Sequence, residues 1–153
     1  MKEKLREFSL WAEIISSIAV LITLVILIFE VRGNTQVLRS NAYQSQLEKH
    51  NNFRELLLSD DKNLEVYGLF LSRDIPEEGS IQHLRLSTIL TNVWNNNDGA
   101  YAAYTAGMLD GNEWERINRT ACGHYSLIVG TTLEARVFIR VSAEFVSYLE
   151  ENC

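Results

Sequence analysis

The longest run of apolar positions lies near the start of the chain, where residues 13–30 read EIISSIAVLITLVILIFE. From Leu10 to Phe29 the only charged side chain is Glu13. Extended to Val31, a helix of this segment measures about 33 Å at about 1.5 Å per residue, which is enough to cross a bilayer core of about 30 Å. Because a backbone in hydrocarbon must satisfy its own hydrogen bonds, the run predicts one transmembrane helix.

A cleaved secretory signal peptide is the main alternative for this region, because such peptides also have a basic start followed by an apolar stretch. After the run the chain continues IFEVRGNTQ, without the small residues of a cleavage site, and Trp11 lies where interfacial tryptophans are common. We therefore predict a retained membrane anchor over residues 1–33, followed by a helical stalk and a soluble α-helical domain over residues 34–153.

Small and polar residues recur inside the apolar run at a spacing of four and three residues in alternation. This candidate helix–helix seam consists of Ala12, Ser16, Ala19, Thr23, Ile26, Glu30 and Gly33. Small and hydroxyl side chains let helix backbones approach and can bond across helices, and a seven-residue repeat stays aligned in a left-handed supercoil.

Two other interpretations of the seam stay open. The hydroxyl groups can bond back to their own helix while Glu13 and Glu30 reach interfacial water. Alternatively, a homo-oligomer can form a pore lined by Ser16, Thr23 and Glu30, whose ring of carboxylates would favour cations.

The rest of the chain has the composition of helices, which predicts an all-α fold. Spaced apolar residues predict helices near 35–58, 63–72, 81–109, 113–122 and 142–149, with a loop at 73–79. Gly33 either separates the helix near 35–58 from the anchor or lies within one continuous helix. Residues 95–99 are a candidate break in the helix near 81–109. Gly123 and Gly130 are candidate helix ends, and residues 131–141 fit either a strand or a helix.

Charge and cysteine content narrow the class of protein. The net charge is −6 and no concentrated basic surface is visible, which argues against a nucleic-acid partner. Lys and Arg nearly balance on the two sides of the apolar run, so the positive-inside rule does not decide the orientation. Cys122 and Cys153 form no CxxC pair, and we predict reduced thiols, which favours a cytoplasmic soluble domain.

The sequence contains no recognisable catalytic or nucleotide-binding motif. His50, His83 and His124 lack the short spacing of metal ligands, so we predict surface or capping histidines, no metal site and no cofactor.

Asp98 is the one polar residue that stands out, because it lies among tyrosine, tryptophan and asparagine. It is a candidate buried carboxylate held by Tyr101, Asn97 or an arginine such as Arg136 or Arg140. The favoured alternative is a solvated break in the helix.

Three short motifs run along nearly the whole chain. They are Val31-Arg32-Gly33-Asn34-Thr35 with Asn41-Ala42-Tyr43-Gln44; Asp98, Tyr101 and Tyr104 before Gly107-Met108-Leu109-Asp110 and Trp114; and Ser142-Ala143-Glu144-Phe145. With them the chain resembles a large uncharacterised bacterial family of small single-pass membrane proteins with an "IRxNT" junction and a helical C-terminal domain. It departs from that pattern at Glu30, where glutamine is usual, at Ala143, where proline is usual, and in lacking a tryptophan pair before Ser142. The resemblance implies the architecture and no catalytic residue.

We therefore predict a bacterial inner-membrane protein with one N-terminal transmembrane helix. It is expected to be a homo-oligomeric, non-enzymatic structural, scaffolding or regulatory component, with the lipid bilayer and another membrane protein as candidate partners. The alternatives are the cation-conducting pore and an enzyme with a site around Asp98.

Overall fold

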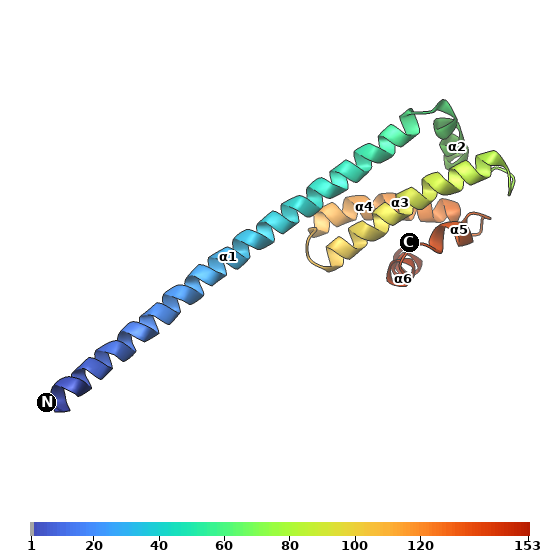
Figure 1. The fold of residues 1–153 in the computed structure, drawn as a ribbon. Helices are drawn as coiled ribbons and strands as arrows, with labels where there is room; N and C mark the ends of the chain where they lie inside the picture. Colours follow the sequence, from blue (N-terminus) through green and yellow to red (C-terminus); the bar gives the residue numbers. More distant parts are fainter. Residues whose placement is uncertain (1) are drawn as a thin grey trace. The chain divides into compact units, whose positions relative to one another are not determined.

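The computed structural model describes residues 2–153, with the side chains of residue 11 and residues 13–153. Within these residues the chain forms six helices and no strand, which confirms the predicted all-α fold (Figure 1). The helices are α1 (Lys2–Leu58), α2 (Asp61–Leu71), α3 (Ile81–Thr105), α4 (Gly111–Ile128), α5 (Glu134–Phe138) and α6 (Ala143–Asn152). The chain divides into two units, Met1–Ser40 and Asn41–Cys153, which are described in turn.

In the first unit α1 passes through Gly33 without a break. The Thr35 hydroxyl donates a hydrogen bond to the Val31 carbonyl at 2.8 Å, so Thr35 lies inside the helix and does not cap a new one. A single glycine in a helix interior costs only about 1 kcal/mol relative to alanine, which a long helix tolerates. Of the two interpretations of Gly33, the continuous helix is the one observed.

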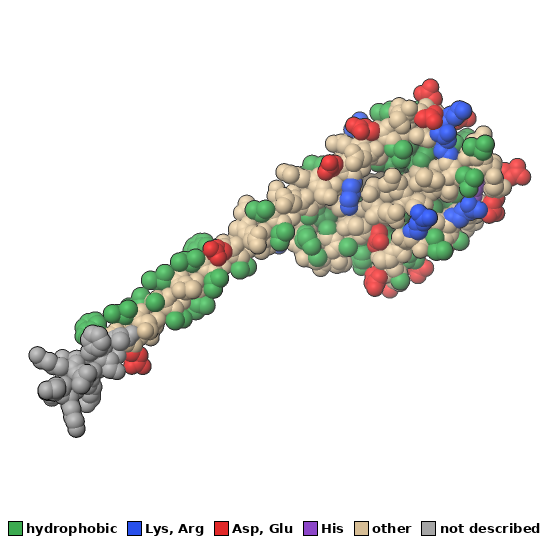
Figure 2. All heavy atoms as spheres, in the orientation of Figure 1, with side chains coloured by type: hydrophobic (Ala, Val, Ile, Leu, Met, Phe, Trp, Pro, Cys, Tyr) green, Lys and Arg blue, Asp and Glu red, His purple; other side chains and the backbone are tan. Residues whose placement is uncertain are grey.

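The apolar residues of the first unit are exposed on every side of α1. From Ile14 to Val31 the large apolar side chains retain 48–68% of their accessible surface, and hydrophobic side chains are spread along the visible face of this helix (Figure 2). The core helix of a soluble protein would bury one such face. By length and composition α1 can cross a membrane, and it is the one helix of the described residues that can.

In the second unit α3 is the central helix. It contacts α2, α4 and α5, while α4 also contacts α6 (Figure 1). Leu86, Leu90 and Trp94 of α3 are fully buried, together with Phe70 of α2 and Phe145 of α6. These large side chains form the middle of a single apolar core to which most helices of the unit contribute.

The predicted break at residues 95–99 is wrong, because α3 runs unbroken from Ile81 to Thr105. Trp94 and Ala100 lie on either side of this stretch and are both fully buried. Packing therefore fixes the helix before and after the poor helix formers between them, and tertiary contacts override weak local propensity.

The ambiguous segment at residues 131–141 forms the short helix α5 and not a strand. Leu133 and Val137 are four residues apart and both fully buried, which is the spacing of one helix face. Gly123 lies inside α4, so its assignment as a helix end is wrong. Gly130, with φ of 77°, follows the end of α4 and confirms the other candidate.

Polar contacts fix the helix ends of the second unit. Asp60 caps α2, and Arg85 of α3 binds both Asp60 at 2.6 Å and the Asn63 amide oxygen at 2.8 Å. The Asn63 side chain in turn donates to the Leu56 carbonyl at the end of α1. The backbone N–H of Lys62, followed by the Arg85 guanidinium, lowers the pKa of the Asp60 carboxyl. At α4, Asp110 and Glu113 form the predicted capping box.

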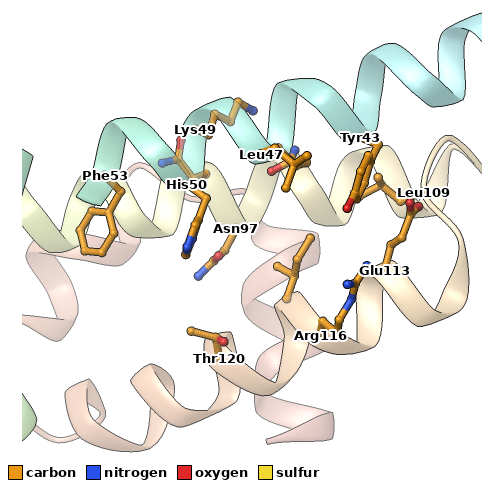
Figure 3. A pocket seen from close by; sticks show the side chains of 13 residues that line it. Tyr43, Leu47, Lys49, His50, Phe53, Asn97, Leu109, Glu113, Arg116 and Thr120 are labelled. Atoms are coloured by element: carbon orange, nitrogen blue, oxygen red, sulfur yellow. The ribbon is translucent and has the colours of Figure 1, made fainter. Parts of the chain in front are cut away.

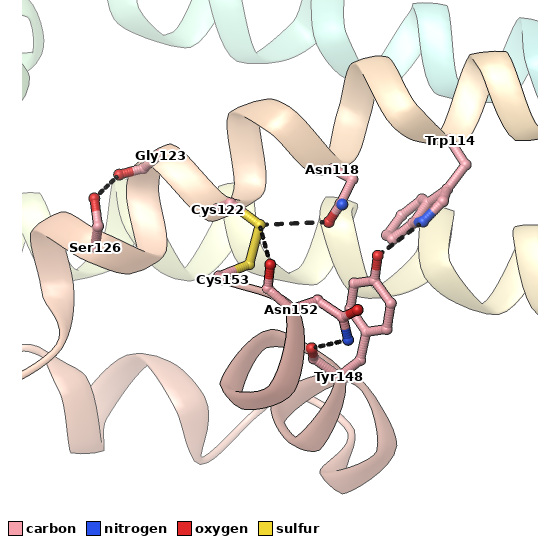
Figure 4. Close-up of a disulfide and its surroundings, with 8 residues drawn as sticks. All are labelled: Trp114, Asn118, Cys122, Gly123, Ser126, Tyr148, Asn152 and Cys153. Atoms are coloured by element: carbon pink, nitrogen blue, oxygen red, sulfur yellow. Dashed lines mark hydrogen bonds between the residues drawn. A yellow bond between two sulfur atoms is a disulfide. The ribbon is translucent and has the colours of Figure 1, made fainter.

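Cys122 of α4 and Cys153, which follows α6, form a disulfide (Figure 4). The prediction of reduced thiols is therefore wrong. The two cysteines are 31 residues apart in sequence, but packing of α6 on α4 brings their Cα atoms to 5.1 Å. Beside the disulfide, the Trp114 indole N–H donates to the Tyr148 hydroxyl at 3.3 Å, which links the same two helices a second time.

Reduction of the disulfide should destabilise the second unit, because it releases a loop that the bond closes in the unfolded chain. We expect the free energy of unfolding to fall by about 3 kcal/mol. Urea denaturation of the full chain in detergent, followed by tryptophan fluorescence with and without a phosphine reductant, measures the change. The variant with both Cys122→Ala and Cys153→Ala should not respond to the reductant. Equal stability of the oxidised and reduced wild type would contradict the prediction.

Candidate functional site

The second unit contains a half-open pocket of about 370 Å³ between α1, α3 and α4 (Figure 3). It is lined by Tyr43, Gln46, Leu47, Lys49, His50 and Phe53 of α1, by Asn96 and Asn97 of α3, by Leu109, and by Glu113, Arg116, Ile117 and Thr120 of α4. Pockets of this volume, with mostly apolar walls and a few polar groups, are typical of small-molecule sites.

Along α1 the pocket lies between two places that pack on the core, Ala42 on one side and the stretch from Phe53 to Leu57 on the other. Phe53 meets the Tyr67 ring at 5.6 Å, and Leu57 is buried in the core. Earlier along α1, the facing positions on α3 and α4 are occupied by the short polar side chains Asn97 and Thr120. Side chains of this size leave the space between the helices unfilled.

Several polar groups face this space. The side-chain nitrogen of Asn97 is buried and has no hydrogen-bond partner among the described residues. The imidazole of His50 and the hydroxyl of Thr120 point toward the same region from α1 and α4 (Figure 3). Buried amide donors are nearly always satisfied in folded proteins, so an unsatisfied one in a pocket wall is a feature that a ligand can explain.

Lys49 and Glu113 have defined positions in the wall of the pocket. The Lys49 Nζ atom lies 3.1 Å from where a Cβ on Gly99 would be, so the missing side chain at Gly99 leaves room for the ammonium group. Glu113 accepts a hydrogen bond from the Asp110 backbone N–H at 2.9 Å as part of the capping box. One carboxylate of the pocket therefore also stabilises the start of α4.

Asp98 is neither held by the partners expected from the sequence nor part of a solvated helix break. Its carboxylate accepts hydrogen bonds from the backbone N–H of Ser142 at 3.0 Å and from the Ser142 hydroxyl. It is half-buried inside an unbroken helix, so the solvated break is wrong, and Ser142 takes the place expected for Tyr101, Asn97 or an arginine. Because Ser142 also caps α6, Asp98 fixes the start of that helix on α3.

Tyr101 belongs to an aromatic cluster and not to a polar site. Its ring stacks on Phe145 at 5.2 Å and lies 4.9 Å from Tyr148, and the Tyr104 ring stacks on Trp114 at 5.3 Å. The second and third sequence motifs, which are far apart in the chain, are thus joined by the Asp98–Ser142 contact and by this cluster. Their observed role is to pack α3, α4 and α6 together.

Two of the three histidines are buried, which corrects the prediction of surface or capping residues. His83 is fully buried and bonds to the Thr132 hydroxyl at 3.1 Å, while His124 bonds to the Tyr67 hydroxyl at 2.9 Å. Burial lowers the pKa of the His124 imidazole and so favours its neutral form. Only His50 remains exposed, and it lines the pocket.

The candidate seam lies in the first unit. The side chain of Ala12 is outside the described part of the chain, while Ser16, Ala19, Thr23, Ile26, Glu30 and Gly33 are all exposed on α1. The Thr23 hydroxyl donates to the Ala19 carbonyl at 2.9 Å, and Ser17, beside the seam, bonds to Glu13 in the same way. The helix–helix seam stays a prediction, and the Thr23 hydroxyl already has a hydrogen-bond partner within its own helix.

Arg136 and Arg140, which the sequence offered as partners of Asp98, line a second and more open cleft between α3 and α5. Neither forms a salt bridge within the described residues. The facing hydroxyl groups of Thr88 and Thr91 bond to carbonyls of their own helix. This cleft therefore has two exposed cations but no buried polar group left without a partner.

Comparison with known proteins adds no assignment, because no protein-family model, curated protein or solved structure matches the chain. The resemblance to the bacterial membrane family stays a prediction.

Replacing Asp98 by alanine should destabilise the second unit by about 1–3 kcal/mol, because two hydrogen bonds to a charged group are lost at the start of α6. Thermal or urea denaturation measures the loss, and Asp74→Ala, at an exposed loop position, is the matched control. Since Asp98 and Ser142 act through one contact, combining Asp98→Ala with Ser142→Ala should cost less than the sum of the single changes. Additive losses would contradict the assigned contact.

Proposed function

We propose that this chain is a single-pass bacterial inner-membrane protein that associates with itself and acts as a non-enzymatic structural, scaffolding or regulatory component. The observation that carries the proposal is the apolar surface of α1, which is exposed on every side between Ile14 and Val31. Such a surface needs hydrocarbon or other helices around it, because water is an unfavourable solvent for it. The sequence motifs support the bacterial assignment through the family resemblance.

Self-association is supported by the composition of the seam. Ser16, Ala19 and Thr23 are small residues at heptad spacing within a helix that is otherwise rich in Ile, Leu and Val. Lipid chains are as apolar as those large side chains, so helix association in a membrane depends on close backbone approach at small residues. The exposed seam allows this approach, with Thr23 offering its methyl group while its hydroxyl bonds to its own helix.

A structural role is supported by how the conspicuous polar residues are used. Asp98 binds Ser142, Glu113 closes a capping box, and Arg85 joins the ends of α1 and α2 to α3. Each of these groups stabilises a helix end or a helix–helix contact. These polar contacts thus hold the helices of the second unit together.

We further propose that the second unit lies on the oxidising side of the membrane. Disulfides persist mainly outside the reducing cytoplasm, so the Cys122–Cys153 bond favours a non-cytoplasmic domain over the cytoplasmic one expected from the sequence. The nearly balanced basic residues around the span permit this orientation, with Lys2, Lys4 and Arg6 on the cytoplasmic side.

Cysteines introduced into the span should distinguish the seam from a plain anchor. We expect Ala19→Cys to form disulfide-linked dimers on oxidation in membranes, because the seam brings this position close to its copy. Leu21→Cys should not form such dimers, because Leu21 lies only about 3 Å further along the helix but on its opposite side.

Non-reducing gels measure the products, and the unmodified chain serves as the control because its own cysteines are paired with each other. Equal linkage at both positions, or none at either, would remove the seam from the proposal.

Orientation is testable by labelling intact spheroplasts with a membrane-impermeant maleimide. Glu78→Cys, in the exposed loop between α2 and α3, should react from outside, whereas Glu3→Cys, ahead of the span, should react only after lysis. The two variants are matched, since each replaces one glutamate in an otherwise unchanged chain. The reverse pattern would place the domain in the cytoplasm and refute the oxidising-side assignment.

A further inference from the structure

The pocket between α1, α3 and α4 combines an apolar body with a buried hydrogen-bond donor that has no partner among the described residues. Its apolar lining residues include Leu47, Phe53, Leu109 and Ile117, and Tyr43 lies at one end (Figure 3). A ligand that fills it must therefore bury an apolar portion against these side chains, as small-molecule sites usually require.

The polar part of the pocket contains one buried donor without an acceptor and more positive than negative side chains. The buried Asn97 nitrogen has no partner, and neither Lys49 nor Arg116 forms a salt bridge within the described residues. The one carboxylate of the wall, Glu113, accepts the Asp110 backbone N–H. With two cations and one carboxylate among its lining residues, the wall carries a formal charge of +1, which is complementary to a single negative charge.

We propose that this pocket binds a small amphipathic carboxylate, an organic monoanion with an apolar body. One carboxylate oxygen accepts the Asn97 side-chain N–H, and the positive charges of Lys49 on α1 and Arg116 on α4 favour the anion. The apolar body lies along Leu47, Phe53 and Ile117. A carboxylate fits better than a phosphate monoester, because a dianion would exceed the surplus positive charge of the wall.

This inference does not depend on self-association or on the orientation in the membrane. Binding to the pocket can therefore succeed or fail independently of the proposed function.

The test uses the full chain in nanodiscs of uncharged lipid, with 4-phenylbutyrate as the probe and saturation-transfer NMR as the readout. Empty nanodiscs measure partition into lipid, and 4-phenylbutanol and phenyl phosphate serve as neutral and dianionic probes. We expect phenylbutyrate to bind above the empty-disc level and at least about fivefold more tightly than either other probe. No excess signal over empty discs, or equal or tighter binding of the alcohol or the phosphate, would overturn the assignment.

Variants identify the site. Asn97→Leu, which removes the donor at similar size, should weaken phenylbutyrate binding by about tenfold, and Arg116→Gln by about threefold. Arg119→Gln is the matched control, because Arg119 lies on the same helix but pairs with Glu115 and does not line the pocket. Leu47→Trp, at a partly exposed lining position, should block the pocket even if Asn97→Leu is unstable. Unchanged affinity in Leu47→Trp, or equal losses in Arg116→Gln and Arg119→Gln, would place the ligand elsewhere.

Discussion

The contact between Asp98 and Ser142 organises the second unit. One carboxylate in the middle of α3 accepts both the backbone N–H and the hydroxyl of the residue that begins α6. With that start fixed, Phe145 enters the core and Tyr148 reaches Trp114. The end of α6 then places Cys153 against Cys122. A short helix of ten residues is marginal alone, so its position depends on these contacts and not on its own propensity.

The two units of the chain satisfy different constraints. In the first unit, the backbone hydrogen bonds are made within the helix and the apolar side chains are exposed. This arrangement suits the hydrocarbon core of a membrane. In the second, apolar residues are gathered inside, and polar residues close the helix ends. The change occurs along α1 without a break, since Gly33 and Thr35 remain helical. The backbone of α1 is thus one continuous helix, although its residues belong to two units.

Local patterns predicted most of the helices, because apolar spacing and caps act over a few residues. The all-α fold, the loop at 73–79 and the capping box at Asp110 follow from such signals. Local patterns failed where distant residues decide the outcome. The stretch around Asp98 is helical because Trp94 and Ala100 are held by the core, and the cysteines pair because α6 packs on α4.

The candidate site also depends on residues that are distant in the sequence. Asp98 and Tyr101 were predicted as a candidate polar pair, but Asp98 binds Ser142 and Tyr101 packs on Phe145. These partners lie some forty residues away, in α6 and its cap. The pocket residues on α1, α3 and α4 share no motif, and a clear chemical sign of the site is the unpartnered nitrogen of Asn97. That sign depends on what surrounds the amide, so it appears only in three dimensions.

One consequence of a continuous α1 concerns regulation. Tyr43, Leu47 and Phe53, which line the pocket, belong to the same helix as the apolar span. A ligand that binds these residues changes the free energy of the conformations available to this part of α1. If self-association favours one of those conformations, then ligand binding must promote or oppose association by the same factor by which association alters ligand affinity. If the ligand regulates association, it must bind the associated and the separate forms of the protein with different affinities. Tight binding that is equal in both forms would not shift the equilibrium between them.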